Sequence, residues 1–138
     1  MANDFSPVPD EVDEPFRKNQ SWVKRFAVAC RGVKVAVRLE ASFFVHLFVA
    51  AIVLLAGAVL GIARWEWCLV VLCIAAALSA ELFNTSIERI ARVVTRQENP
   101  EIRDALDTAS GAVLVVALGS AIIGLLVFGT RAAAMLGY

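Results

Sequence analysis

Long apolar runs constrain the fold of this chain more than any other feature. Residues 43–63 include one histidine and no other ionisable side chain, and similar runs without a charged residue cover residues 67–80 and residues 111–129. At 1.5 Å per residue, a helix of about 20 residues crosses the hydrocarbon core of a bilayer. The overall apolar content of 59% also exceeds that of a typical soluble domain. The pattern predicts an all-α integral membrane protein with transmembrane helices at about 43–63, 67–88 and 108–129.

The ends of these runs predict how the helices are connected and oriented. The first two runs are separated by residues 64–66, so they should form a tight helical hairpin. Seven basic residues precede the first run and four lie between the second and third, against one in the hairpin and one near the C-terminus. The excess of basic residues places the N-terminus and the second loop in the cytoplasm and the C-terminus outside. The small-residue pairs Gly57/Gly61 and Ser120/Gly124 favour close approach of helices.

Residues 21–40, before the first run, have the pattern of an amphipathic helix. Basic residues recur along one stripe at Lys24, Arg31, Lys34 and Arg38. Apolar residues lie opposite, at Trp22, Phe26, Ala29, Val33 and Val37. We expect a surface helix on the cytoplasmic leaflet; the alternative is a soluble helix packed on a partner. Residues 1–20 are acidic, contain proline and lack the features of a signal peptide, so we expect a flexible tail. Residues 132–138 form a short C-terminal tail.

A stripe of polar side chains follows the second apolar run without a break. Glu81, Asn84 and Glu88 are three and then four residues apart, so they share one helix face. A carboxylate near the membrane boundary costs several kcal/mol unless something compensates for it. Solvation could account for Glu88 if it were a lone acid at a helix end. Two acids and an asparagine on one stripe instead indicate a site.

A second polar stripe opens the third helix at Asp104, Asp107 and Ser110. Helix capping could account for Asp104, whereas Asp107 should face the second helix. Glu40 ends the surface helix, so acids from three segments meet at the cytoplasmic edge of the membrane. Oxygen ligands of this kind suit Mg²⁺, which prefers a few carboxylates together with nucleotide phosphates. The sequence has no Walker-type loop, so phosphate chemistry would depend on carboxylates, metal and nearby cations.

Four stretches of the sequence resemble one family of membrane enzymes. They are RFAVACRGVKVAVRLEASFFVHL, EW after the first run, AELFNTSIE and ALDTASGAVL. The chain resembles the prokaryotic diacylglycerol kinases and undecaprenol kinases over roughly residues 25–128. AELFNTSIE carries the most specific similarity, because it is close to the family's ELxNTAIE signature. The resemblance implies a kinase domain over residues 21–131, in the bacterial cytoplasmic membrane with its active site on the cytoplasmic side.

The same resemblance implies roles for individual residues. Glu81 matches the general base that takes the proton of the lipid hydroxyl, and Glu40 and Glu88 match the glutamates that hold Mg²⁺. The positions assigned to the nucleotide are Glu40, Asn84, Glu88 and Asp107. The positions assigned to the lipid are Glu81 and Ser110. The family uses ATP as co-substrate and works as a homotrimer with active sites shared between subunits, and no nucleic acid is expected as a partner.

Two positions depart from the family pattern. A lysine usually precedes the aspartate that corresponds to Asp107, but the residue here is Leu106. An acid found in many members is replaced by Arg92. We expect Arg92 or Arg103 to neutralise phosphate in place of the missing lysine.

Three hypotheses follow from these features. The first is a lipid kinase that phosphorylates diacylglycerol or undecaprenol, and in this reading His46 is a packing or interface residue. The second is a catalytically weak or inactive trimeric module that binds lipid or nucleotide, which Leu106 favours and the three glutamates disfavour. The third, a small ion transporter, would need charged residues in mid-span, and the first and third runs have none.

Overall fold

The structure is a computed structural model that describes residues 21–95 and 97–137. In these residues the chain forms the helices α1 (Trp22–Leu39), α2 (Ala41–Leu60), α3 (Arg64–Val94) and α4 (Pro100–Met135). The prediction of an all-helical chain is confirmed. Helices α2, α3 and α4 are long and apolar enough to cross a membrane, which agrees with the three predicted spans. The predicted acidic tail, residues 1–20, lies outside the described residues.

Helix α1 contains a boundary between two units of the chain. The first unit ends at Gly32, and the second begins at Val33 and includes α2, α3 and α4. In the first unit the guanidinium of Arg25 lies 5.3 Å from the ring centre of Trp22, a cation–π geometry. The side chains of Trp22 and Phe26 are largely exposed. A role of α1 on the membrane surface stays a prediction.

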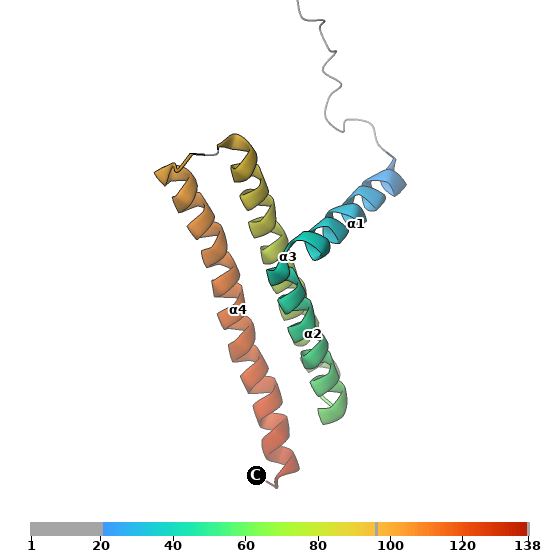
Figure 1. Ribbon diagram of the computed structural model, residues 1–138. Coiled ribbons are helices and arrows are strands. Elements are labelled where there is room, and N and C mark those ends of the chain that lie inside the picture. Colours follow the sequence, from blue (N-terminus) through green and yellow to red (C-terminus); the bar gives the residue numbers. More distant parts are fainter. Residues whose placement is uncertain (1–20, 96, 138) are drawn as a thin grey trace, which may run out of the picture. The chain divides into compact units, whose positions relative to one another are not determined.

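Helix α3 packs against both α2 and α4, with the α2–α3 turn at one end and the α3–α4 loop at the other (Figure 1). The buried core lies toward the α2–α3 turn, where Ile62, Val70 and Val127 contact one another and are covered by Trp67 and Phe128, among others. Elsewhere on α2, α3 and α4 many large apolar side chains are exposed. Exposure on this scale is typical of helices that face lipid or another membrane helix rather than water.

The α2–α3 turn is as tight as predicted but lies three residues earlier. Helix α2 ends at Leu60 because Gly61 adopts a left-handed conformation (φ 62°), in which its N–H bonds to the carbonyl of Gly57. Residues 64–66, predicted as the connection, form the first turn of α3 instead. The two helices approach closely here, since a Cβ atom on Gly57 would lie 3.0 Å from the Trp67 ring.

The start of α4 also differs from the expectation. The helix begins at Pro100, eight residues before the predicted span, and continues beyond the predicted end to Met135. Asn99 is its N-cap, and the Asn99 side chain accepts hydrogen bonds from the backbone N–H groups of Glu101 and Ile102. Proline at the first helical position fits this start, because its missing N–H would have had no partner. The suggestion that Asp104 caps the helix is therefore wrong.

A buried ion pair joins the α2–α3 turn to the far end of α4. Glu66 is 4% exposed. Its Oε2 accepts hydrogen bonds from Nε and Nη2 of Arg131, at 2.9 and 2.7 Å, and from the backbone N–H of Ala63 at 2.6 Å. We call this contact the Glu66–Arg131 clamp. It holds the α2–α3 turn and the last turns of α4 together.

Candidate active site

The polar residues singled out in the sequence occupy the half of the bundle nearer to the α3–α4 loop, away from the Glu66–Arg131 clamp. Glu40 is the N-cap of α2, in an extended conformation (φ −121°, ψ 115°), and its side chain makes no capping hydrogen bond. Because the chain bends at Glu40, the first turn of α2 meets α3 beside the polar stripe. Helix periodicity then places Glu81, Asn84 and Glu88 along one side of α3.

Glu81 is the most deeply buried of the predicted site residues, with 3% exposure. The hydroxyl of Ser42, on α2, donates a hydrogen bond to Glu81 Oε1. In residues 21–95 and 97–137, no lysine or arginine forms an ion pair with Glu81. Glu81 is thus a buried carboxylate whose side-chain partner is a hydroxyl rather than a cation.

Asn84, Glu88 and Ser110 form a polar contact between α3 and α4. The Asn84 side-chain amide donates to Glu88 Oε1 at 2.9 Å. The Ser110 hydroxyl lies 3.4 Å from Asn84 Oδ1 and 3.0 Å from the carbonyl of Leu106. A hydroxyl has one proton, so the shorter contact to the carbonyl is the stronger hydrogen bond. Ser110 thus lies beside Asn84, which in turn donates to Glu88.

Glu40 and Glu88 converge on one cation. Arg92 Nη2 lies 3.2 Å from Glu88 Oε2 and 3.9 Å from Glu40 Oε1, so the same nitrogen bridges two helices. Oxygen atoms of two carboxylates, one at the start of α2 and one on α3, thus lie within 3.9 Å of one nitrogen atom. In the described part of the chain, no group of three or more acidic, histidine or cysteine side chains is placed to hold a metal. Two carboxylates fit Mg²⁺ that takes its remaining ligands from phosphate and water.

A cleft of about 440 Å³ opens beside these residues, between the end of α3 and the start of α4. Glu88 and Arg92 line it from α3, and Arg103, Leu106 and Asp107 line it from α4. Arg103 also pairs with the exposed Glu98 in the connecting loop, at 3.2 Å. The lining of the cleft therefore carries both signs of charge.

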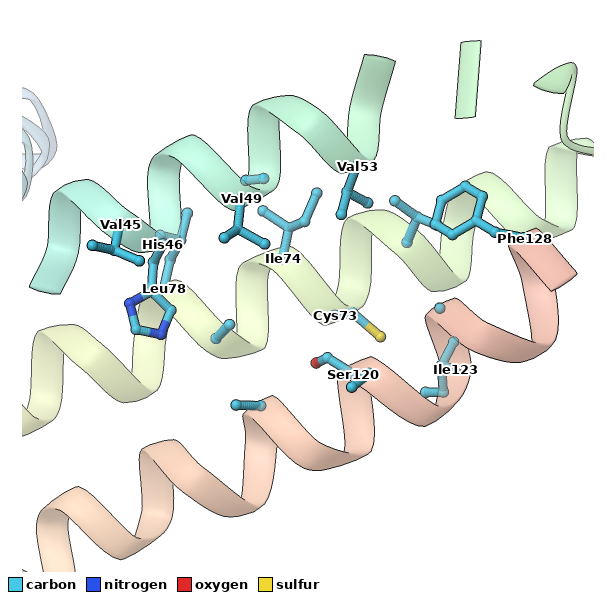
Figure 2. A pocket seen from close by; sticks show the side chains of 16 residues that line it. Val45, His46, Val49, Val53, Cys73, Ile74, Leu78, Ser120, Ile123 and Phe128 are labelled. Atoms are coloured by element: carbon cyan, nitrogen blue, oxygen red, sulfur yellow. The ribbon is translucent and has the colours of Figure 1, made fainter. Parts of the chain in front are cut away.

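An apolar pocket of about 360 Å³ lies between α2, α3 and α4, deeper in the bundle (Figure 2). Its walls are mostly aliphatic, and His46 and Leu78 lie at one end while Phe128 lies at the other. Leu78 is three residues before Glu81, and His46 is four residues after Ser42. The His46 end of the pocket is thus the end nearest to the Ser42–Glu81 hydrogen bond.

The structure brings the predicted residues together in three groups. In the first group, Glu81 accepts a hydrogen bond from Ser42. In the second, Glu40 and Glu88 both contact Arg92. In the third, Asp107 and Arg103 border the cleft. Sequence reasoning missed Ser42. The sequence did offer a signal for this residue, because Ser42 is a polar residue two positions after Glu40 in a stretch that is otherwise apolar.

Comparison with known proteins gives the class of this chain. The model of the prokaryotic diacylglycerol kinase family matches residues 27–128. The chain therefore belongs to the prokaryotic diacylglycerol kinase family, and the predicted enzyme class, a lipid kinase, is confirmed.

Two relatives with lipid kinase names are similar to this chain. The chain is 39% identical to an undecaprenol kinase of Bacillus subtilis, over 78% of this chain and 87% of that protein. It is 29% identical to a diacylglycerol kinase of Synechocystis, over 80% of this chain and 67% of that protein. No solved structure matches this chain.

Proposed function

We propose that this protein transfers the γ-phosphate of ATP to the hydroxyl group of a membrane lipid alcohol. The observation that carries the proposal is the pair of carboxylates, Glu40 and Glu88, that share one cation in the half of the bundle where Glu81 is buried against Ser42. A general base and a divalent metal site are the groups that a kinase without a phosphate-binding loop needs. The cleft beside Glu88 would hold the phosphates of ATP.

The residues would act by positioning and by charge. Glu81 would take the hydroxyl proton as the lipid oxygen attacks the γ-phosphorus, and ADP would leave with the electrons of the broken P–O bond. Glu40 and Glu88 would hold Mg²⁺, whose charge neutralises the phosphate oxygens when it is bound. Asn84 and Asp107 would contact the nucleotide, and Ser110 would lie beside the lipid head.

We infer that the preferred lipid is a polyprenol such as undecaprenol, with diacylglycerol as the alternative. Of the two relatives above, the one named as an undecaprenol kinase has the higher identity and the greater coverage. Both lipids offer one hydroxyl at the interface and a long apolar chain. The apolar pocket that starts near Glu81 supports a substrate of this kind.

The assembly and orientation are also proposals. A homotrimer with shared sites would cover part of the exposed apolar surface of α2, α3 and α4. The positive-inside rule supports a cytoplasmic site in the bacterial inner membrane, with α1 on the cytoplasmic leaflet and the C-terminus outside.

A direct assay tests this proposal. Purified protein in mixed micelles is given radiolabelled ATP together with undecaprenol or diacylglycerol. We expect transfer that stops when EDTA removes Mg²⁺ and resumes when Mg²⁺ is restored. Glu81→Gln should lose about 100-fold or more of the rate, whereas the exposed Glu101→Gln control should stay near wild type. Transfer to neither lipid by folded protein would favour the inactive module, and an active Glu81→Gln would reject the assignment of the base.

A further inference from the structure

The hydrogen bond between Ser42 and Glu81 differs from the other hydroxyl contacts of this bundle. Ser86, Thr108, Ser110 and Thr130 each donate to the backbone carbonyl four residues earlier in their own helix. This is the usual contact of a serine or threonine inside a helix, and it leaves no proton for another partner. Ser42 instead crosses from α2 to α3 and donates to a carboxylate that is 3% exposed.

The position of Ser42 in the chain accounts for this difference. Ser42 is the second residue of α2 (Ala41–Leu60) and follows the extended residue Glu40. Its hydroxyl is therefore available to α3, on the face that carries Glu81. The same short stretch supplies a proposed metal ligand and a partner of the proposed base.

The backbone of Ser42 contacts a residue that lines the apolar pocket. Its carbonyl oxygen lies 2.9 Å from Nδ1 of His46. A carbonyl can only accept a hydrogen bond, so Nδ1 carries the proton and donates it. His46 lines the end of the apolar pocket (Figure 2). Ser42 therefore contacts both a residue at that end of the pocket and the carboxylate of Glu81.

We propose that Ser42 is a positioning residue for Glu81 in the kinase reaction, an inference that rests on the function proposed above. Its hydroxyl proton holds Oε1, and among the described residues none donates to Oε2. Oε2 is thus the oxygen left to accept the proton of the lipid hydroxyl at the end of the apolar pocket. The hydrogen bond fixes the carboxylate rotamer, so that the base needs no reorganisation when the lipid arrives.

The test compares Ser42→Ala with Ser42→Thr, which keeps a hydroxyl. We expect Ser42→Ala to lower kcat about tenfold or more, because one hydrogen bond to a carboxylate is lost. The KM values for ATP and for lipid should change less than about twofold, since Ser42 contacts neither directly. Ser42→Thr should recover most of the rate. Ser86→Ala is the matched control, because its hydroxyl contacts its own helix, and it should behave as wild type.

A double-mutant cycle separates this role from general stability. Glu81→Asp shortens the carboxylate so that Ser42 no longer holds it. Adding Ser42→Ala to Glu81→Asp should then cost less than about twofold. A wild-type kcat in Ser42→Ala, a Ser42→Thr variant as slow as Ser42→Ala, or an equal loss in both backgrounds would overturn the inference. These outcomes leave the proposed function intact, which instead fails if the wild-type protein phosphorylates neither lipid.

Discussion

At the scale of single residues, Arg92 occupies the position where the proposed metal site meets the proposed nucleotide cleft. Its guanidinium contacts Glu88 and Glu40, yet its side chain is 64% exposed and borders the cleft. An exposed ion pair contributes little to stability, so Arg92 can leave these carboxylates at low cost. We therefore expect Arg92 to move toward phosphate when Mg²⁺ and ATP bind. Leu106, which lines the same cleft, has no charge with which to neutralise phosphate.

Replacement of Arg92 tests this expectation. Arg92→Ala should raise the KM for ATP by about fivefold or more, because the cleft loses a cation that faces the phosphates. Adding Leu106→Lys should restore much of the affinity by supplying the lysine that is usual in the family. Nucleotide binding and turnover would be measured for both variants and for Arg103→Ala. Arg89→Ala, outside the cleft lining, is the control. Wild-type affinity and turnover in both Arg92→Ala and Arg103→Ala would contradict phosphate neutralisation by these arginines.

At the scale of helices, the packing of α2 on α3 depends on Gly57. A Cβ atom there would lie 3.0 Å from Cη2 of Trp67 and 3.1 Å from Cδ1 of Ile62, closer than ordinary contact. Ile62 belongs to the buried core, and Trp67 packs against it. The side chains that would have to move are thus those that hold the turn end of the bundle.

Gly57→Ala should destabilise the protein by about 1 kcal/mol or more, because overpacking forces these side chains to shift. Thermal unfolding in detergent would show a lower midpoint. Gly119→Ala in α4 is the matched control, since a Cβ there meets no atom within 4 Å. That variant should be neutral or slightly stabilising, as alanine favours a helix more than glycine does. Equal unfolding midpoints for the two variants would mean that the close approach at Gly57 does not affect the stability of the protein.

Local patterns explain which elements the sequence could predict. The spacing of Glu81, Asn84 and Glu88 indicated a shared face because helix periodicity operates within a few residues. The first turns of α4 were missed because they are polar and therefore outside the apolar run, although Asn99 and Pro100 form a helix-start pair. The partner of Glu81 could not be predicted, since Ser42 is 39 residues away and the contact depends on how α2 crosses α3.

At the scale of the whole molecule, the Glu66–Arg131 clamp joins segments 65 residues apart. Glu66 is nearly fully buried, whereas the Arg131 side chain is 36% exposed. Removing one partner of a buried pair leaves an uncompensated charge. The clamp lies at the opposite end of the bundle from Glu81, so its loss should affect stability rather than the reaction.

Arg131→Ala should lower the free energy of unfolding by about 2 kcal/mol, a value reduced from that of a fully buried pair because Arg131 is partly solvated. The double variant Glu66→Gln/Arg131→Gln should be closer to wild type, as no buried charge remains. Chemical unfolding in micelles would measure both, with the exposed Arg64→Ala as control. The rate per folded molecule should be unchanged. A single variant as stable as wild type would show that the Glu66 carboxylate finds another partner.

The clamp also has a consequence for how the protein is made. The ribosome completes Glu66 long before Arg131, so the hairpin of α2 and α3 enters the bilayer with a carboxylate that still lacks its guanidinium. The charge is compensated once the last helix has been inserted with its C-terminal turns beside that hairpin. A nascent chain that stops before Arg131 therefore lacks the cation that compensates the Glu66 carboxylate in the folded protein.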